Sequence, residues 1–178
     1  MKKPLRPETI WKLVDNWDTA EVLDCGSSNG SLGMRYYLKH GLFPDKVTAV
    51  DIDPQALAVL EAKGVSTVCM DLEKDDLIET LISKYDLILC CEVLEHITWE
   101  AEKEIIDSFM KMLNQNGTLV ISFPLNAKVN GKSKAKAKPH IRQPFAEPIE
   151  KLLTPYFEFY TKVEMNYRTQ LLLFSGRK

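Results

Sequence analysis

The sequence predicts an α/β fold of the doubly wound type, with a mostly parallel sheet and helices on both faces. Short apolar runs alternate with segments of helical period along most of the chain. This alternation is typical of parallel strands joined by crossover helices. In addition, a turn with two glycines follows the first apolar run, and acidic residues end the second. Such a pair marks a ligand-binding edge in sheets of this type.

Size and composition indicate one domain over residues 1–178. The chain is 45% apolar and 27% charged, which suits one substantial core and is short for two. No stretch approaches the roughly 20 apolar residues of a membrane-spanning helix. Because the opening Met-Lys-Lys-Pro is not followed by an apolar run, no leader is predicted, and we expect a cytoplasmic protein.

The elements follow in order along the chain. Apolar runs predict five strands, at residues 21–25, 46–52, 66–70, 85–91 and 117–123. Helical spacing predicts the crossovers, at residues 30–39, 54–62, 75–83 and 99–113. Pro54 after Asp53 marks the start of the second crossover helix, and Gly64 marks its end. His40, beside Gly41, is interpreted as a structural residue at a helix end.

The two ends of the chain add further elements. Residues 7–17 carry apolar residues at helical spacing and predict an amphipathic helix. Two roles stay open for it: to cover the sheet edge or to close over a bound ligand. Residues 145–153 predict a short helix, and residues 157–167 and 170–175 predict two strands with a turn near 166–169.

Four cysteines fall in segments predicted as buried strands or strand ends. They are Cys25, Cys69, Cys90 and Cys91, and we expect all four to be reduced core residues. Their spacing contains no Cys-x-x-Cys pair for zinc. Since Cys90 and Cys91 are adjacent, they are expected on opposite faces of one strand.

The turn after the first strand distinguishes between two nucleotide-like cofactors. Gly26, Ser28 and Gly30 allow backbone to approach a ligand at a helix start, and Asp51 at the end of the next strand suits a ribose diol. A dinucleotide pyrophosphate would meet Asp24 as a nearby anion. S-adenosylmethionine (SAM) has no phosphate and carries an ammonium that this acid can attract, so the residues favour SAM.

These segments resemble class I (Rossmann-like) SAM-dependent methyltransferases over nearly the whole chain. The matching segments are residues 24–30, Asp51, 70–72, 85–97 and 113–122. One departure is Ser28, where the family usually has glycine. The resemblance implies a seven-stranded sheet that ends in an antiparallel strand, and a SAM-dependent methyltransferase activity. Such enzymes often have an N-terminal lid, which would be residues 1–18 here.

The resemblance also implies which residues bind SAM. Asp51 would accept hydrogen bonds from the ribose, and Ile52 would lie against the adenine. Asp71, with Leu72, would contact the adenine edge and ring, although Asp71 could instead be solvated or cap a helix. The full predicted set is Asp24, Gly26, Ser28, Asn29, Gly30, Asp51, Ile52, Asp71, Leu72 and Cys91.

Catalytic residues are harder to predict, because SAM is already activated and a methyltransferase needs mainly alignment and sometimes a base. Glu92, Glu95 and His96 span about one helical turn, and His140 is expected over the same cleft. Together they could hold a divalent metal, as in the similar Glu-x-x-Glu-His plus distal His pattern of small-RNA 2′-O-methyltransferases and ubiquinone-pathway O-methyltransferases. In metal-independent relatives the acids cap the helix and the His packs beside the cofactor.

Charge patterning gives a second hint about the acceptor. Residues 125–146 contain no acid, whereas the whole chain has a net charge of −2. The six basic residues there are Lys128, Lys132, Lys134, Lys136, Lys138 and Arg142. They predict either a basic acceptor-side loop, 125–145, that faces a polyanion or nucleic acid, or an ordinary solvated loop.

The predicted function is therefore methyl transfer from SAM to an unidentified acceptor, most readily at oxygen or nitrogen. The alternatives left open are a metal-assisted RNA 2′-O-methyltransferase, a non-catalytic SAM-binding module and, more remotely, an NAD-dependent oxidoreductase. The acceptor itself is not predicted, because acceptor pockets are built from variable loops.

Overall fold

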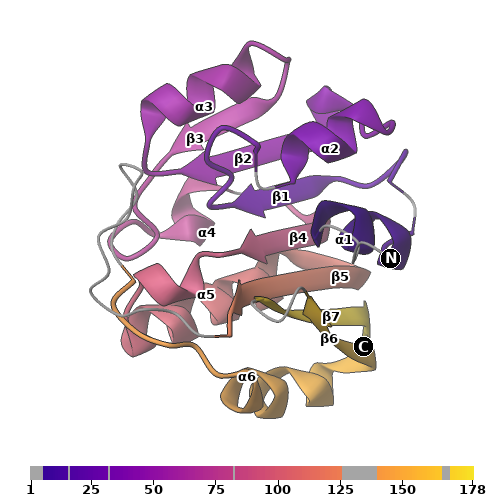
Figure 1. Cartoon of the computed structure of the whole chain (residues 1–178), viewed down its shortest axis with the longest axis vertical. Coiled ribbons are helices and arrows are strands. Elements are labelled where there is room, and N and C mark those ends of the chain that lie inside the picture. The colour runs from indigo at the N-terminus through magenta and orange to yellow at the C-terminus, as the bar shows by residue number, and fades with distance from the viewer. Residues whose placement is uncertain (1–5, 16, 32, 82, 126–139, 166–168) are drawn as a thin grey trace.

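A computed structural model describes residues 6–15, 17–31, 33–81, 83–125, 140–165 and 169–178 of the chain. Its centre is a seven-stranded sheet of order β3-β2-β1-β4-β5-β7-β6 with helices on both sides (Figure 1). The strands are β1 Val22–Cys25, β2 Val47–Asp51, β3 Ser66–Cys69, β4 Tyr85–Cys91, β5 Leu113–Pro124, β6 Phe157–Met165 and β7 Thr169–Arg177.

Strand directions confirm the predicted fold class. Strands β1 to β5 pair in parallel, β7 is antiparallel to β5, and β6 is antiparallel to β7. The predicted C-terminal strand pair is present, and most of the turn expected between its strands lies outside the described residues. The strand order reverses between β1 and β4, so the carboxyl ends of these two strands form the switch point where open α/β sheets bind ligands.

Six α-helices and three short 3-10 turns are described. The helices are α1 Arg6–Leu13, α2 Met34–Lys39, α3 Pro54–Glu61, α4 Leu77–Thr80, α5 Trp99–Met112 and α6 Ala146–Leu153. The 3-10 turns are η1 Pro44–Lys46, η2 Leu94–His96 and η3 Thr154–Tyr156.

Two helices are shorter than the sequence predicts. Helix α2 begins at Met34 rather than at residue 30, because Gly30 has a left-handed φ of 79° that no helix interior accepts. Helix α4 is a single turn, with Asp76 accepting hydrogen bonds from the backbone N–H groups of Ile78 and Glu79. The other described residues of the predicted crossover, 75, 76, 81 and 83, are not helical.

Each face of the sheet has its own hydrophobic core. One core holds Cys90 of β4 and the buried faces of α4, α5 and α6. The other holds Cys91 and the buried faces of α1, α2 and α3. The prediction that adjacent Cys90 and Cys91 point to opposite faces is confirmed, and α1 covers the sheet from the same side as α2 and α3.

The prediction of four buried cysteines is wrong at one position. All four are free thiols, and Cys25, Cys90 and Cys91 are buried, but Cys69 is exposed. Cys69 ends β3, which is the outermost strand of the sheet and has a partner on one side only. An edge strand leaves part of its side chains in water. Within the described residues, no helix is both long and apolar enough to cross a bilayer.

Candidate active site

The turn after β1 has a conformation that requires glycine. Gly26 has a φ of 74°, and its N–H donates to the carbonyl of Val50 at 2.8 Å. A Cβ atom added to Gly26 would lie 2.2 Å from Cγ2 of Val93. Both the backbone conformation and the close packing exclude a side chain here, so bare backbone faces the carboxyl end of β4.

Asp51, at the end of β2, ties this turn to the next loop. One carboxylate oxygen accepts from the N–H of Ser28 at 2.7 Å, and the other accepts from the N–H of Asp53 at 3.0 Å. Ser28 itself has a left-handed φ of 49°, a conformation that suits the glycine usual at this position. The two backbone donors fix the orientation of a carboxylate whose remaining lone pairs are available to a diol.

The region predicted to bind adenine contains one exposed apolar residue and one acid that is paired with residues of its own turn. Ile52, next to Asp51, is 48% exposed, and Leu72 is partly buried against the core. Asp71 accepts from the N–H of Glu73 at 3.2 Å and pairs with Lys74 at 3.2 Å. These two contacts make Asp71 stabilise the turn at residues 72–74, a role that was not predicted from the sequence.

Asp24 is buried at the switch point. Its side chain is 8% exposed, and burial raises its pKa to about 7, with a further upward effect from Asp51 and a downward effect from the Arg6 guanidinium. A ligand ammonium placed beside Asp24 would favour the ionised carboxylate. The site therefore contains a buried acid whose raised pKa a nearby cation would lower.

Arg6 is a site residue that the sequence did not predict. Its Nη1 lies 3.2 Å from Oε1 of Glu92 and 3.5 Å from Oγ of Ser122, and its side chain is 13% exposed. Ser122 in turn donates to Glu92 at 3.1 Å. Glu92 has a left-handed φ of 59°, directly after β4. Glu92, predicted as a metal or catalytic residue, is thus engaged by α1 and β5.

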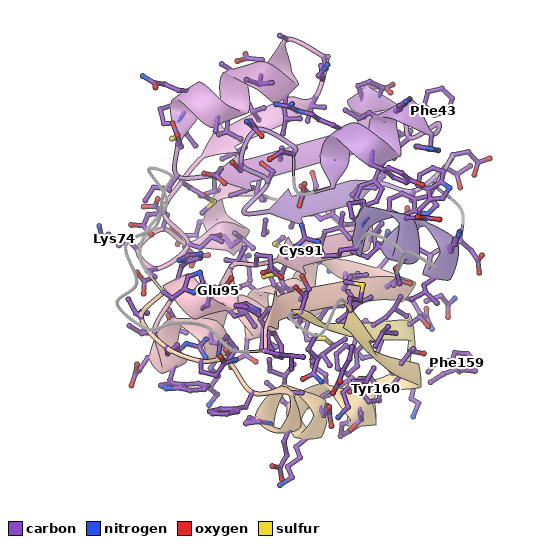
Figure 2. The ribbon with its side chains drawn as sticks, in the orientation of Figure 1. Phe43, Lys74, Cys91, Glu95, Phe159 and Tyr160 are labelled. Atoms are coloured by element: carbon purple, nitrogen blue, oxygen red, sulfur yellow. The ribbon has the colours of Figure 1, made fainter. Side chains whose placement is uncertain are left out.

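Three of the four predicted metal-ligating residues meet. Glu95, His96 and His140 place one candidate ligand atom each within 4.8 Å of one another. The two imidazole rings are 4.8 Å apart at 68°. The N–H of Ile141 donates to the Glu95 carbonyl at 2.8 Å, and this bond holds the segment after residue 139 against η2. Figure 2 shows Cys91 near the centre of the molecule and Glu95 below it, on the segment after β4.

Glu95 is the buried member of this cluster. It is 1% exposed, and its Oε2 has no hydrogen-bond partner among the described residues, while Oε1 is 3.9 Å from Nε2 of His96. Burial, followed by the nearby Glu92 charge, raises the Glu95 pKa to about 8. An unsatisfied buried carboxyl oxygen is costly unless a proton or a cation completes its bonding.

Arg142 is not part of a basic surface, contrary to the prediction. It is 7% exposed, it forms an ion pair with Glu102, and its Nε donates to the Ile97 carbonyl at 2.6 Å. Its guanidinium carbon also lies 3.9 Å from the centre of the Trp99 ring. The side chain anchors the segment after residue 139 to α5. The five lysines of the predicted basic loop lie outside the described residues.

Three other residues that the sequence singled out have local structural contacts. The side chain of Asn29 accepts from the N–H of Ser31 at 3.1 Å and stabilises the glycine turn. Cys91 is buried at the carboxyl end of β4, and burial raises its pKa to about 11, so it is an inert thiol. His40 stacks on Tyr36 with ring centres 3.9 Å apart at the end of α2, which confirms its structural role.

Comparison with known proteins identifies the family. Residues 23–119 match the family model described as a methyltransferase domain. No curated protein matches the chain.

Solved structures share the fold at low sequence identity. The N-methyltransferase NodS from Bradyrhizobium japonicum has a TM-score of 0.65 and 20% identity, over 97% of this chain and 95% of its own. TehB from Haemophilus influenzae has a TM-score of 0.69 and 16% identity. The match with TehB covers 96% of this chain and 61% of TehB. Magnesium protoporphyrin IX methyltransferase from Synechocystis, solved with bound SAM, has a TM-score of 0.62 and 20% identity. The match covers 95% of this chain and 76% of that enzyme.

The family match spans more than half of the chain, and it covers the glycine turn, Asp51 and the segment after β4. The chain is thus a member of the methyltransferase-domain family, a SAM-dependent methyltransferase of class I fold.

Proposed function

We propose that this chain transfers the methyl group of SAM to an oxygen or nitrogen of its acceptor. The observation that carries the proposal is the placement of Asp51. Its carboxylate is fixed by the backbone of Ser28 and of Asp53, beside the glycine turn and next to the β1–β4 switch point. This is the place and the chemistry that a ribose diol requires.

The residues present fit SAM along the carboxyl ends of β1, β2 and β4. Asp51 would hold the ribose, and the exposed Ile52 would cover one adenine face together with Leu72. The bare backbone of Gly26 would allow close approach, and Asp24 would pair with the ammonium. The remaining contacts would come from the backbone of Ser28, Asn29, Gly30, Asp71 and Cys91.

The acceptor would approach over Glu95, His96 and His140. When bound, SAM supplies a methyl carbon already activated by its sulfonium. The chain then has to orient the acceptor, exclude water and remove one proton. His96 and His140 are half-buried imidazoles, and a neutral imidazole can take that proton near neutral pH.

A divalent cation in this cluster is a second candidate, and the buried Glu95 Oε2 is the observation that favours it. Two imidazoles and a carboxylate suit Zn²⁺, Fe²⁺ or Mn²⁺. Such an ion would bind an acceptor hydroxyl and lower its pKa. Glu92 is engaged by Arg6, so the four-ligand set inferred from the sequence is reduced to three.

Titration calorimetry with Zn²⁺ or Mn²⁺ tests the cation directly. Binding by the wild type that is lost in both Glu95→Gln and His140→Ala would support it. If neither ion binds the wild type, the cation is ruled out, and His96 and His140 remain as candidate bases that act without a metal.

A transfer assay with methyl-labelled SAM tests the proposed function. RNA, protein and small-molecule pools should be offered with and without a chelator. RNA is included because the five lysines of residues 125–145 would suit a polyanion. Transfer to one pool by the wild type, and none by Asp51→Asn, is the expected result. SAM binding without transfer to any pool would favour a non-catalytic module, and tighter binding of NAD than of SAM would favour an oxidoreductase.

A further inference from the structure

The segment that begins with His140 reaches the acceptor side from a distant part of the chain. The His140 ring lies 4.8 Å from the ring of His96. The next residue, Ile141, donates its N–H to the carbonyl of Glu95 at 2.8 Å. The place of the His140 imidazole therefore depends on what holds the residues directly after it.

Arg142 anchors this segment through three contacts. Its Nε donates to the Ile97 carbonyl at 2.6 Å, its Nη2 forms an ion pair with Glu102, and its guanidinium carbon lies 3.9 Å from the centre of the Trp99 ring. All three partners lie within residues 97–102, directly after η2. One side chain thus ties the segment to the stretch of chain that supplies the rest of the cluster.

Charge contributes more to this docking than apolar burial does. Ile141 and Phe145, the large apolar residues of the segment, are 40% and 57% exposed. The side chains of Arg142 and Glu102 are only 7% and 8% exposed. The ion pair is therefore the buried part of the contact between the segment and α5.

A buried ion pair is sensitive to the loss of one partner, because the remaining charge is left without water or a counter-charge. Gln143 also holds the segment, by donating to the Pro124 carbonyl at 2.7 Å. That bond ties the segment to β5 and not to η2, so it does not set the distance to the other members of the cluster. The Arg142–Glu102 pair does.

We propose that Arg142 is a positioning residue for His140. Through its ion pair with Glu102 it sets where the His140 imidazole lies relative to His96 and Glu95. This inference rests on the proposed function, in which His140 takes the proton of the acceptor or binds a cation. Arg142 acts through His140 and does not itself contact the acceptor.

Glu102→Gln tests this role, because it keeps the shape of the side chain and removes its charge. Turnover on the acceptor found by the screen should fall by about 10- to 100-fold, as expected when a reacting group is displaced by ~1 Å. The affinity for SAM should be unchanged. In proton NMR, the nuclear Overhauser effect between the rings of His96 and His140 should be present in the wild type and weaker in Glu102→Gln.

Two substitutions of Arg142 give a rescue comparison. Arg142→Lys should keep more turnover and more of the ring contact than Arg142→Gln, because lysine keeps the charge without the planar fork of donors. All variants are measured well below their melting temperatures. A pair that only stabilised the fold would lower the melting temperature but leave the turnover and the ring contact of the folded molecules unchanged.

Glu147→Gln is the matched control. It makes the same change in an exposed ion pair, with Lys151 at 2.7 Å, so turnover and ring contact should equal those of the wild type. If Glu102→Gln fails to fold, Arg142→Lys carries the comparison. Full turnover with an intact ring contact in Glu102→Gln would overturn the Arg142 assignment. A wild type that transfers no methyl group to any pool would overturn the proposed function, and the ring contact would still decide whether Arg142 positions His140.

Discussion

The two halves of the site are built in different ways. The proposed donor side is formed mainly by backbone: Gly26 and Ser28 have left-handed conformations, and Asp51 is bonded to main-chain N–H groups. The proposed acceptor side is formed by side chains from separate segments: Glu95 and His96 come from η2, and His140 comes from a segment more than 40 residues later.

This difference bears on what the sequence could predict: a local pattern marks the glycine turn and Asp51, and the family resemblance led us to expect Glu95, His96 and His140 together, but the acceptor itself was not predicted. A cofactor shared by a whole class of enzymes is held by local backbone conformations, and those leave a short pattern in the sequence. An acceptor specific to one enzyme is held by side chains that tertiary packing brings together, and these leave no local pattern. The following changes test whether the donor side depends on backbone and the acceptor side on side chains.

The largest effect is expected for Gly26→Ala. The new Cβ would lie 2.2 Å from Val93 Cγ2, at a φ of 74°. The free energy of unfolding should fall by about 2–5 kcal/mol, from overpacking and left-handed strain together, and SAM binding should be lost. Gly64→Ala is the control, because it has a φ of 85° but its nearest neighbour is at 3.5 Å; it should cost about 1–2 kcal/mol. Equal denaturation midpoints for the two variants would contradict a packing requirement at Gly26.

On the acceptor side, His140→Ala should lower turnover by ~10²- to 10⁴-fold, as expected for a lost general base or a lost metal ligand. The affinity for SAM should be unchanged, because His140 belongs to the other half of the site. Steady-state kinetics on the acceptor found by the screen, with calorimetry for SAM, measure both quantities. His40→Ala should keep turnover, since His40 stacks at the end of α2. A parallel loss of SAM affinity in His140→Ala would show that the two halves are not separate.

A smaller effect is expected for pH. The folded pKa of Asp24, about 7, is above its ordinary value of 3.8, so its ionisation destabilises the folded protein as pH rises between these values. Asp24→Asn should therefore raise the melting temperature at pH 8 and leave it nearly unchanged at pH 4.

Wild-type affinity for SAM should weaken by up to about tenfold per pH unit below pH 7. A wild-type affinity that is flat between pH 5 and 8 would remove Asp24 as the partner of the ammonium.

Much of the fold could be predicted from the sequence, because hydrophobic period and turn residues are local signals. They predicted the five parallel strands, the two C-terminal strands and the main crossover helices, α3 and α5, and the family resemblance implied the antiparallel end of the sheet. These local signals failed where the position of a residue in the tertiary structure decides whether it is buried. Cys69 is exposed because its strand is at the sheet edge, and Arg142 is buried because Glu102 and Trp99 of α5 surround it.

Arg6 shows the same limit in the site itself. The sequence indicated an amphipathic helix near it and left open whether that helix covers the sheet or closes the site. The contacts that bring Arg6 into the site join it to Glu92 and to Ser122, which is 116 positions away. No periodicity or motif encodes such a pair, whereas the Asp51 contact with Ser28 lies within one βαβ unit.

Calorimetric titration of SAM tests the central claim most directly, with Asp51→Asn compared against Asp53→Asn. Asp53 caps α3, accepting from the N–H of Gln55 at 2.9 Å, and asparagine caps about equally well. If Asp51 binds the ribose, Asp51→Asn should weaken SAM by about 10- to 100-fold, and Asp53→Asn should bind like the wild type. Equal affinity of SAM for wild type and Asp51→Asn would contradict the account.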